Sequence, residues 1–236
     1  SCACGHLLAR WPTLCGDAQP GAWAADDRVA SETTAPDWAG NALRSLSVAY
    51  DATHLYLGLD GETATAAGNA LLVVLDRDAG AGTGVADLGT LTDSLGALDD
   101  ACSGTLSATG VSGFGAEFCL GTVDMTSVAV GGGPAGLDRA GLRDVAANPA
   151  DFGWAADGNG SLVAVAAPGG AGAWVEVAVP WTVLYGVGGL PVSGPRLSLF
   201  VRIAGPDGTA HANQSLPSQG GSAVQTVGAV FTFRAR

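Results

Sequence analysis

Three aspartates that follow one short apolar segment have the residue type and the spacing needed to bind a cation. The segment 71–75 is a continuous run of leucine and valine, which is typical of a strand buried on both faces. Asp76 and Asp78 follow this run, and Asp87 closes a glycine-rich loop after them. Calcium takes about six to eight oxygen ligands, and small residues between carboxylates let the backbone turn around the ion. The sequence therefore predicts a strand-to-loop calcium site formed by Asp76, Asp78 and Asp87.

This loop differs from an EF-hand although its spacing is similar. Asp76, Asp78, Gly80 and Asp87 fall at positions one, three, five and twelve of such a loop. Gly80 has no side-chain ligand, alanine stands at the sixth position, and the last ligand is aspartate rather than glutamate. We therefore interpret the loop as a calcium site of another kind. A solvated turn rich in aspartate and glycine, without a metal, is the alternative that the sequence leaves open.

No arrangement of nucleophile, base or paired acids indicates an enzyme. The sequence has no Gly-x-Ser-x-Gly elbow, no Walker loop and no dinucleotide fingerprint, and its three histidines follow no catalytic pattern. A glycosidase needs two carboxylates across a cleft. Glu117 and Glu176 lie on expected strands and could face each other, but glutamates on strands usually face solvent. We therefore expect a non-catalytic protein.

Two central cysteines are expected to form a disulfide. Residues 105–111 and 114–120 read as the two strands of a hairpin, and Cys102 and Cys119 would lie close together at its open end. Disulfides persist in oxidising compartments, so the five cysteines of the chain indicate a protein outside the cytosol.

The other three cysteines lie near the first residue of the chain. Cys15 is expected to pair with Cys4 or with Cys2, and the fifth thiol is then free or bonded to another molecule. Cys2, Cys4 and His6 resemble part of a zinc site, but they lack a fourth ligand. We predict an N-terminal cysteine-bearing extension over residues 1–15.

The composition excludes several classes of partner. The formal net charge is −12, and all ten basic residues are arginine. Nucleic acids and anionic membrane surfaces both require a basic face, so neither is an expected partner. No stretch reaches the roughly 18 consecutive apolar residues of a membrane-spanning helix, so membrane insertion is not expected. The acidic surface favours an extracellular or cell-surface protein, and the chain begins as a mature or excised fragment would, without a signal peptide.

The apolar segments indicate β-structure throughout. They are runs of about five to eight residues bounded by glycine, proline, asparagine or aspartate, and helical patterns are short and few. We predict an all-β antiparallel sandwich, jelly-roll-like, with few short helical turns, in a single domain over residues 16–236. The clearest expected strands are residues 43–50, 55–59, 162–167, 173–179, 196–203, 210–216 and 227–233.

Several stretches occur in the order seen in one group of β-sandwich domains. They include an aspartate-aromatic hairpin, a central strand and a late Glu-x-Ala-Val-Pro-Trp strand. In this order they resemble the family-nine carbohydrate-binding modules and related DOMON-like sandwiches of secreted bacterial proteins. The resemblance covers most of residues 16–204, and Glu176, Pro180 and Trp181 match its structural signature rather than a binding site. The stretches are Trp23 after Gly16 and Asp17, residues 48–61, residues 69–84 and residues 174–186.

The resemblance implies a sandwich, often calcium-stabilised, that binds sugars between aromatic side chains. The candidate stacking residues are Trp154, Trp38 and Trp174, because a sugar ring packs on a flat aromatic face while polar groups bind its hydroxyls. Core packing is the alternative role of each of these tryptophans. Some relatives bind haem through methionine and histidine, but Met125 is the only methionine here and lacks a supporting histidine, so haem is not expected.

The sequence supports two functions, of which the first is a secreted, non-catalytic carbohydrate-binding module. The second is a structural cell-surface protein or extracellular filament subunit that assembles with copies of itself through strand edges and termini. Its support is a mean hydropathy of +0.30, an odd number of cysteines, and the absence of the edge lysines that discourage strand addition. The C-terminal run 228–234 is then the last strand of a sheet or a strand donated to a partner.

Overall fold

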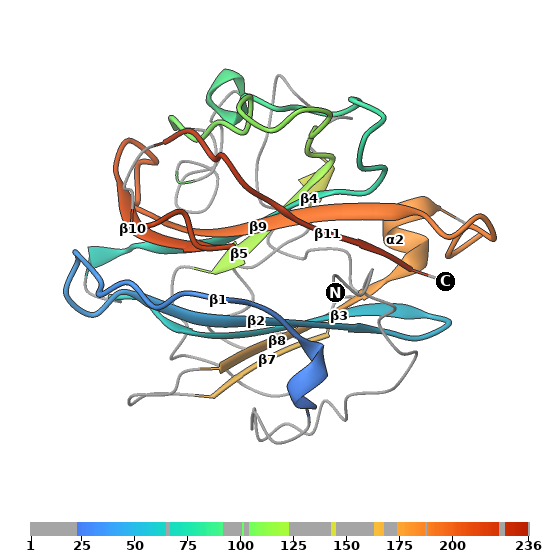
Figure 1. Ribbon diagram of the computed structural model, residues 1–236, viewed down its shortest axis with the longest axis horizontal. Coiled ribbons are helices and arrows are strands. Elements are labelled where there is room, and N and C mark those ends of the chain that lie inside the picture. The colour runs from blue at the N-terminus through green and yellow to red at the C-terminus, as the bar shows by residue number, and fades with distance from the viewer. Residues whose placement is uncertain are drawn as a thin grey trace.

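The computed structural model is an all-β molecule with two antiparallel sheets, which confirms the fold class expected from the sequence (Figure 1). Its short helical elements include η2 (Ala25–Asp27), η4 (Leu88–Thr90) and α2 (Trp181–Tyr185). The residues that the structure describes are 23–64, 67–91, 101, 104–122, 143–144, 163–167, 174–186, 188–221 and 225–235.

In both sheets, strands that are far apart in the sequence become neighbours. Strand β3 lies between β2 and β8 in the first sheet, and β4 lies between β9 and β5 in the second. The first sheet contains, in order, β1 (Arg28–Ser31), β2 (Ala42–Tyr50), β3 (His54–Glu62), β8 (Trp174–Pro180) and β7 (Val163–Ala167). The second contains β10 (His211–Leu216), β9 (Arg196–Ala204), β4 (Ala70–Asp76), β5 (Phe118–Thr122) and β6 (Arg143–Asp144), with β11 (Phe231–Arg234) also paired to β9.

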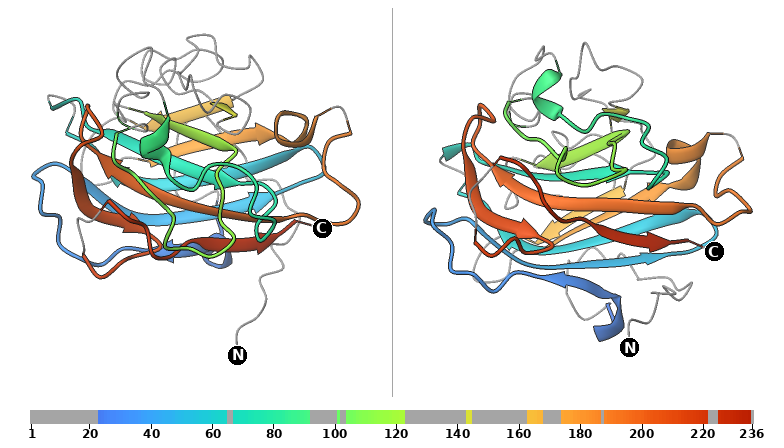
Figure 2. Two further views of the ribbon diagram at one scale, coloured as in Figure 1. Left: turned by 90° about the horizontal axis from the view of Figure 1, so that it is seen from above. Right: turned by 45° about the horizontal axis from the view of Figure 1, so that its top comes forward.

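Strand β4 is buried along its whole length, which confirms the interpretation of the apolar run 71–75. One hydrophobic core contains buried side chains of both sheets, including Leu57 of β3 and Val201 of β9. Successive side chains of a strand point to opposite faces, so Phe200 lies on the face away from Val201. There Phe114 packs against Phe200 with ring centroids 5.6 Å apart. The chain between β4 and β5 therefore covers the outer face of the second sheet, as the teal and green segment in Figures 1 and 2 shows.

The hairpin expected at residues 43–59 is present as β2 and β3, and Asp51 fixes its turn. The Asp51 carboxylate accepts hydrogen bonds from the backbone N–H groups of Thr53 and His54, at 2.6 and 2.8 Å. It also accepts a hydrogen bond from the Tyr56 hydroxyl at 2.7 Å. These bonds lower the pKa of Asp51 although burial opposes them, so the turn is held by a charged acceptor.

The late Pro-Trp motif packs directly against this turn. Trp181 begins α2 and is fully buried, and its indole N–H donates to the backbone oxygen of Asp51 at 2.8 Å. The backbone N–H of Trp181 donates to the oxygen of Thr53 at 2.9 Å. The indole ring also meets Tyr50 edge-on, with centroids 6.2 Å apart. Two motifs that are distant in the sequence therefore form one contact.

Three other expectations have different outcomes. The C-terminal run forms β11, which pairs with β9 of its own chain and is thus the last strand of its own sheet. The hairpin expected from residues 105–111 and 114–120 is wrong, because the first segment contributes only isolated bridges at Ser107, and β5 pairs with β4 and β6 instead. The extension predicted over residues 1–15 lies outside the described residues.

We predict that Trp181→Ala lowers the free energy of unfolding by about 3–5 kcal/mol, because it empties a fully buried site. Trp181→Phe should cost about 1–3 kcal/mol, because it keeps a ring but leaves the Asp51 carbonyl without its donor. Urea denaturation measures both changes. The fully exposed Val192 provides a control, since Val192→Ala should fall within about 0.5 kcal/mol of wild type. Equal midpoints for Trp181→Phe and Val192→Ala would show that the indole contact does not stabilise the fold.

Candidate metal centre and the Trp38 pocket

Two carboxylates come side by side at the end of β4 because of the register of the second sheet. Leu75 of β4 lies opposite Phe118 of β5 in the last pair of the register, and Asp76 and Glu117 are the next residues of the two segments. The backbone N–H of Glu117 donates to the oxygen of Leu75 at 3.1 Å, and the N–H of Arg77 donates to Glu117 Oε2 at 3.0 Å. Asp76 and Glu117 are each 1% exposed. Strand pairing thus creates a buried pair of acids.

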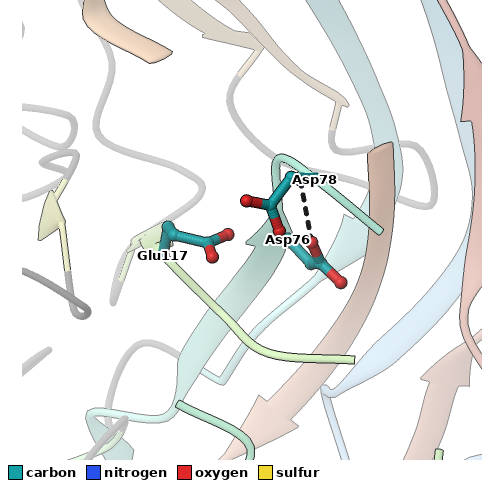
Figure 3. Close-up of side chains that lie close together, drawn as sticks. All are labelled: Asp76, Asp78 and Glu117. Atoms are coloured by element: carbon teal, nitrogen blue, oxygen red, sulfur yellow. Dashed lines mark hydrogen bonds between the residues drawn. The ribbon is translucent and has the colours of Figure 1, made fainter. Parts of the chain in front are cut away.

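Asp78 completes a carboxylate triad with Asp76 and Glu117 (Figure 3). Each of the three side chains offers one oxygen, and these oxygens all lie within 4.8 Å of one another. The backbone N–H of Asp78 donates to Asp76 Oδ1 at 2.9 Å, which holds the turn after β4. The Thr83 hydroxyl lies 2.7 Å from Asp78 Oδ1 and 2.7 Å from Glu117 Oε1. A hydroxyl has one hydrogen, so it can form a full hydrogen bond with only one carboxylate, and a cation or another proton at the second carboxylate would relieve that contact.

Glycines allow the loop after β4 to cross closely over the chain that precedes β5. Gly84 has a φ of +75°, and a Cβ there would lie 2.6 Å from the backbone oxygen of Ala116. A Cβ on Gly115 would overlap the backbone oxygen of Thr83. Val85 and Ala116 exchange both of their backbone hydrogen bonds at 2.9 Å. This crossing fixes the threonine hydroxyl over the carboxylates.

Helix α2 holds the same turn from its other side. The Arg77 guanidinium donates to the backbone oxygen of Leu184 at 2.8 Å, and the Tyr185 hydroxyl donates to the oxygen of Arg77 at 2.7 Å. The guanidinium also lies over the ring of Phe118, 5.6 Å from its centroid. The side chain of Arg77 thus contacts α2 and β5, while its backbone N–H donates to Glu117 of the triad.

Burial changes the acidity of two members of the triad. Loss of water raises the pKa of Asp76 to about 6 and the pKa of Glu117 to about 6. Hydrogen bonds from nearby N–H and hydroxyl groups oppose this rise, whereas the negative charge of Asp78 adds to it for both groups. A divalent cation would neutralise this charge, so the triad is a place where a metal ion could be held.

The triad contains two of the three aspartates that the sequence predicts as ligands. Asp76 and Asp78 belong to it, whereas Asp87 is exposed and is not one of the three. The backbone oxygen of Asp87 accepts hydrogen bonds from the N–H and hydroxyl of Thr90 at 3.1 and 2.7 Å, at the start of η4. Asp87 therefore begins a 3-10 turn, and the third place of the sequence-based set is taken by Glu117.

Glu117 is the member of the triad that sequence reasoning does not find. The sequence pairs it with Glu176 and expects strand glutamates to face solvent, but Glu117 is buried just before β5. Glu176 belongs to β8 of the first sheet, so the two glutamates lie on different sheets. The available signal for Glu117 is the pair Gly113 and Gly115 just ahead of it, since such glycines mark a close approach of backbones.

Trp38 is the one of the three candidate stacking tryptophans whose side chain the structure describes. It is half-buried and lines an open pocket of about 420 Å³. Trp174 is the first residue of β8, and Trp154 lies outside the described residues, so their stacking role stays a prediction. The pocket lies among loops that precede β2 and β4 and follow β9. Its polar lining includes Asn41, Asn69, Asp207 and Thr209.

Strand β10 fixes the loop that carries Trp38. The backbone N–H of Asp37 donates to Asn213 Oδ1 at 3.1 Å, and the N–H of Asn213 donates to Asp37 Oδ1 at 2.9 Å. The Asn213 side chain also donates to the oxygen of Ala35 at 3.0 Å. These bonds hold the segment that precedes Trp38, and the N–H of Asn41 donates to the backbone oxygen of Trp38 at 3.2 Å, so the backbone of Trp38 is ordered before any ligand arrives.

The polar groups around Trp38 are held by hydrogen bonds of their own. Asn41 Oδ1 accepts from the Asn69 side chain at 2.9 Å and from the N–H of Ala64 at 3.0 Å, and both asparagines are buried. Asp207 Oδ1 accepts from the N–H and the hydroxyl of Thr209 at 3.0 and 2.9 Å. The pocket therefore combines a half-buried aromatic ring with fixed amide, hydroxyl and carboxylate groups.

The triad and the Trp38 pocket lie at opposite ends of β4. Asn69 immediately precedes this strand and lines the pocket, whereas Asp76 is the last residue of the strand. At about 3.3 Å per residue, a strand of seven residues separates them by roughly 20 Å. An ion at the triad would thus be too distant to touch a ligand beside Trp38.

The cysteine predictions involve residues outside the described ranges. Cys119 is fully buried in β5, but its expected partner Cys102 is not described. Cys4 and Cys15 also lie outside the described residues. Both expected disulfides therefore stay predictions.

Comparison with known proteins assigns no family to the chain. No family model matches its sequence, and no curated protein matches it either. The resemblance to family-nine carbohydrate-binding modules thus stays an expectation. None of the helices in the described ranges has the length and apolar character required to cross a membrane.

We predict that, in the protein freed of divalent cations, ionisation of Asp76 and Glu117 lowers the thermal stability as the pH rises from about 4 to about 7, and that it opposes the gain from buried His211, whose pKa is lowered to about 4. The pKa values of Asp76 and Glu117 are raised in the fold, so folding favours their protonated forms. Their stabilising contribution is therefore complete below about pH 4 and is lost as the pH rises through about 6. Melting temperatures across this range measure the effect.

Glu117→Gln should remove the part of this loss that Glu117 contributes, because an amide does not titrate, so the variant should lose less stability than the wild type as the pH rises. Asp87→Asn removes an exposed carboxylate of the same loop that lies outside the triad, and it serves as the control variant. Identical profiles for wild type and Glu117→Gln would show that the buried carboxylates do not control the stability.

Proposed function

We propose that this chain is a secreted, non-catalytic carbohydrate-binding module whose sandwich is stabilised by a calcium ion. The observation that carries the proposal is the Trp38 pocket, where a half-buried aromatic ring meets fixed polar groups. The apolar face of a sugar packs on such a ring, while amide, hydroxyl and carboxylate groups bind its hydroxyls. The order of motifs that resembles family-nine modules supports the same function.

The fixed positions and the residue types of the Trp38 pocket lining favour ligand binding over catalysis. The Asp37–Asn213 hydrogen bonds hold the residue before Trp38, and the N–H of Asn41 donates to the backbone oxygen of Trp38. The side chain of Asn69 donates to Asn41 Oδ1. Groups that are already ordered lose less conformational entropy when a ligand binds. The described lining contains a single carboxylate, Asp207, and no histidine, so it lacks the paired acids or the nucleophile and base that hydrolysis requires.

The triad supports calcium as the ion. Its carboxylates supply hard oxygen ligands, which backbone oxygens and water can complete to a full shell. The Thr83 hydroxyl lies 2.7 Å from two carboxylates and can donate to only one, so a cation would relieve the second contact. Calcium accepts irregular loop geometry, whereas magnesium demands a nearly octahedral shell.

The position of the triad supports a structural role for the proposed ion. It lies at the far end of β4 from the Trp38 pocket, beneath the loop that covers the second sheet. Calcium sites of extracellular modules have dissociation constants of about 10⁻⁴–10⁻³ M, so even a weak site is filled outside the cell. The net charge of −12 and the five cysteines support the same location.

We predict that saturating calcium raises the melting temperature by about 5–10 °C. A ligand at about a hundredfold excess over its dissociation constant stabilises the fold by about 2.7 kcal/mol. Each kcal/mol corresponds to about 2–4 °C in a domain of this size. Scanning calorimetry with calcium and with a chelator measures the shift, and Glu117→Gln should abolish it because the variant lacks one buried ligand charge.

Asp87→Asn is the matched control for the calcium experiment. It also neutralises one acid close to the loop, but Asp87 lies outside the triad, so the calcium shift should persist. A shift that persists in Glu117→Gln and disappears in Asp87→Asn would restore the ligand set expected from the sequence spacing. No shift in the wild type would remove calcium from the proposed function.

We predict that Trp38→Ala weakens glycan binding by about tenfold or more, because the variant removes the stacking platform. A glycan array identifies the ligand, and isothermal titration calorimetry then compares the affinities of the variants. Val192→Ala, which changes an exposed residue outside the pocket lining, should bind as wild type does.

The native mass of the same samples tests the alternative function. A monomer that binds glycan through Trp38 agrees with the proposal. A large or open-ended assembly that binds no glycan would contradict it and favour a self-assembling surface protein.

A further inference from the structure

The Trp38 pocket carries one sign of charge. Among its described lining residues, Asp207 has the only ionisable side chain. Hydrogen bonds from the N–H and hydroxyl of Thr209 lower the pKa of Asp207, so its carboxylate is charged at neutral pH. Arg202 of the adjoining strand β9 is fully buried and is not part of the lining. Within the described lining, a ligand in the pocket therefore meets a negative charge and no positive one.

The Asp207 carboxylate also has a fixed position. It lies on the turn between β9 and β10, which is closed by the N–H of Gly208 donating to the oxygen of Gly205 at 3.0 Å. The N–H and the hydroxyl of Thr105 donate to the oxygen of Gly208 at 2.9 and 3.0 Å. Gly104 approaches the same turn so closely that a Cβ there would overlap the backbone of Gly208. The charge is therefore held at the pocket instead of moving with a free loop.

We infer that the Trp38 pocket selects uncharged and amine-bearing saccharides against acidic ones, and that Asp207 sets this selectivity. The inference rests on the proposed carbohydrate binding and names the class of sugar. A carboxylate or sulfate on the bound sugar would meet the Asp207 charge without a cation to neutralise it. Two like charges about 4 Å apart in water disfavour binding by about fivefold, and an ammonium group gains a similar factor. Rejection by a repulsive group is a common source of specificity.

The test compares soluble polysaccharides that share a backbone and differ in charge. Hydroxyethyl, aminoethyl and carboxymethyl derivatives of cellulose cover β-linked glucose, and the same derivatives of starch cover α-linked glucose. Affinity electrophoresis measures binding to each polymer. We expect the wild type to bind the neutral and amine-bearing forms of at least one backbone, and to bind the carboxymethyl form about fivefold more weakly. Asp207→Asn should bring the neutral and carboxymethyl affinities close together, because asparagine keeps the oxygen that accepts the Thr209 bonds.

Asp26→Asn is the matched control for net charge. Asp26 is an exposed residue of η2 outside the pocket lining, and its replacement changes the net charge by the same unit. The inference predicts that Asp26→Asn keeps the wild-type ratio. An equal change in both variants, or no change in Asp207→Asn, would overturn the inference and leave carbohydrate binding intact. A wild type that binds neither these neutral polymers nor any neutral glycan of the array would overturn the proposed function together with the inference.

Discussion

The burial of Asp76 and Glu117 at one end of β4 is the constraint on which the rest of the site depends. A buried carboxylate is unfavourable unless hydrogen bonds or a cation replace the water that it loses. Here the N–H groups of Asp78, Gly115 and Arg77 supply part of that replacement. They reach the carboxylates because glycines let two loop segments cross at van der Waals distance. The negative charge that remains makes the triad a place where a cation could be held, so the loop path and the glycine placement have one physical cause.

Contacts extend from this end of the sandwich to both sheets. Helix α2 receives the Arg77 guanidinium at Leu184, and its first residue, Trp181, donates to the turn of the β2–β3 hairpin at Asp51. The loop after β4 is thereby tied to the first sheet as well as to the second. At the other end of β4, the side chain of Asn69 donates a hydrogen bond to Asn41 Oδ1 in the lining of the Trp38 pocket. An ion at the triad would stabilise the scaffold that positions the pocket without touching its ligand.

The sequence predicts correctly those strands and turns that are specified by residues close together in the chain. The apolar run before Asp76 gives a buried strand, and the alternating segments on either side of Asp51 give a hairpin. Glu117 lies in the triad because β5 pairs with β4. No local sequence pattern specifies which residues of these two distant strands lie opposite each other. Counting along one loop selects Asp87 instead, although that residue begins a separate turn. The Trp38 pocket is built from loops that meet only after both sheets have formed, so its polar lining is not visible in any one stretch.

Diffraction from calcium-loaded crystals, collected at a wavelength where calcium scatters anomalously, tests the central claim most directly. Our account predicts one anomalous peak among Asp76, Asp78 and Glu117, with carboxylate oxygens about 2.3–2.6 Å from the ion. An absent peak at millimolar calcium, or a peak held by Asp87 without Glu117, would contradict it.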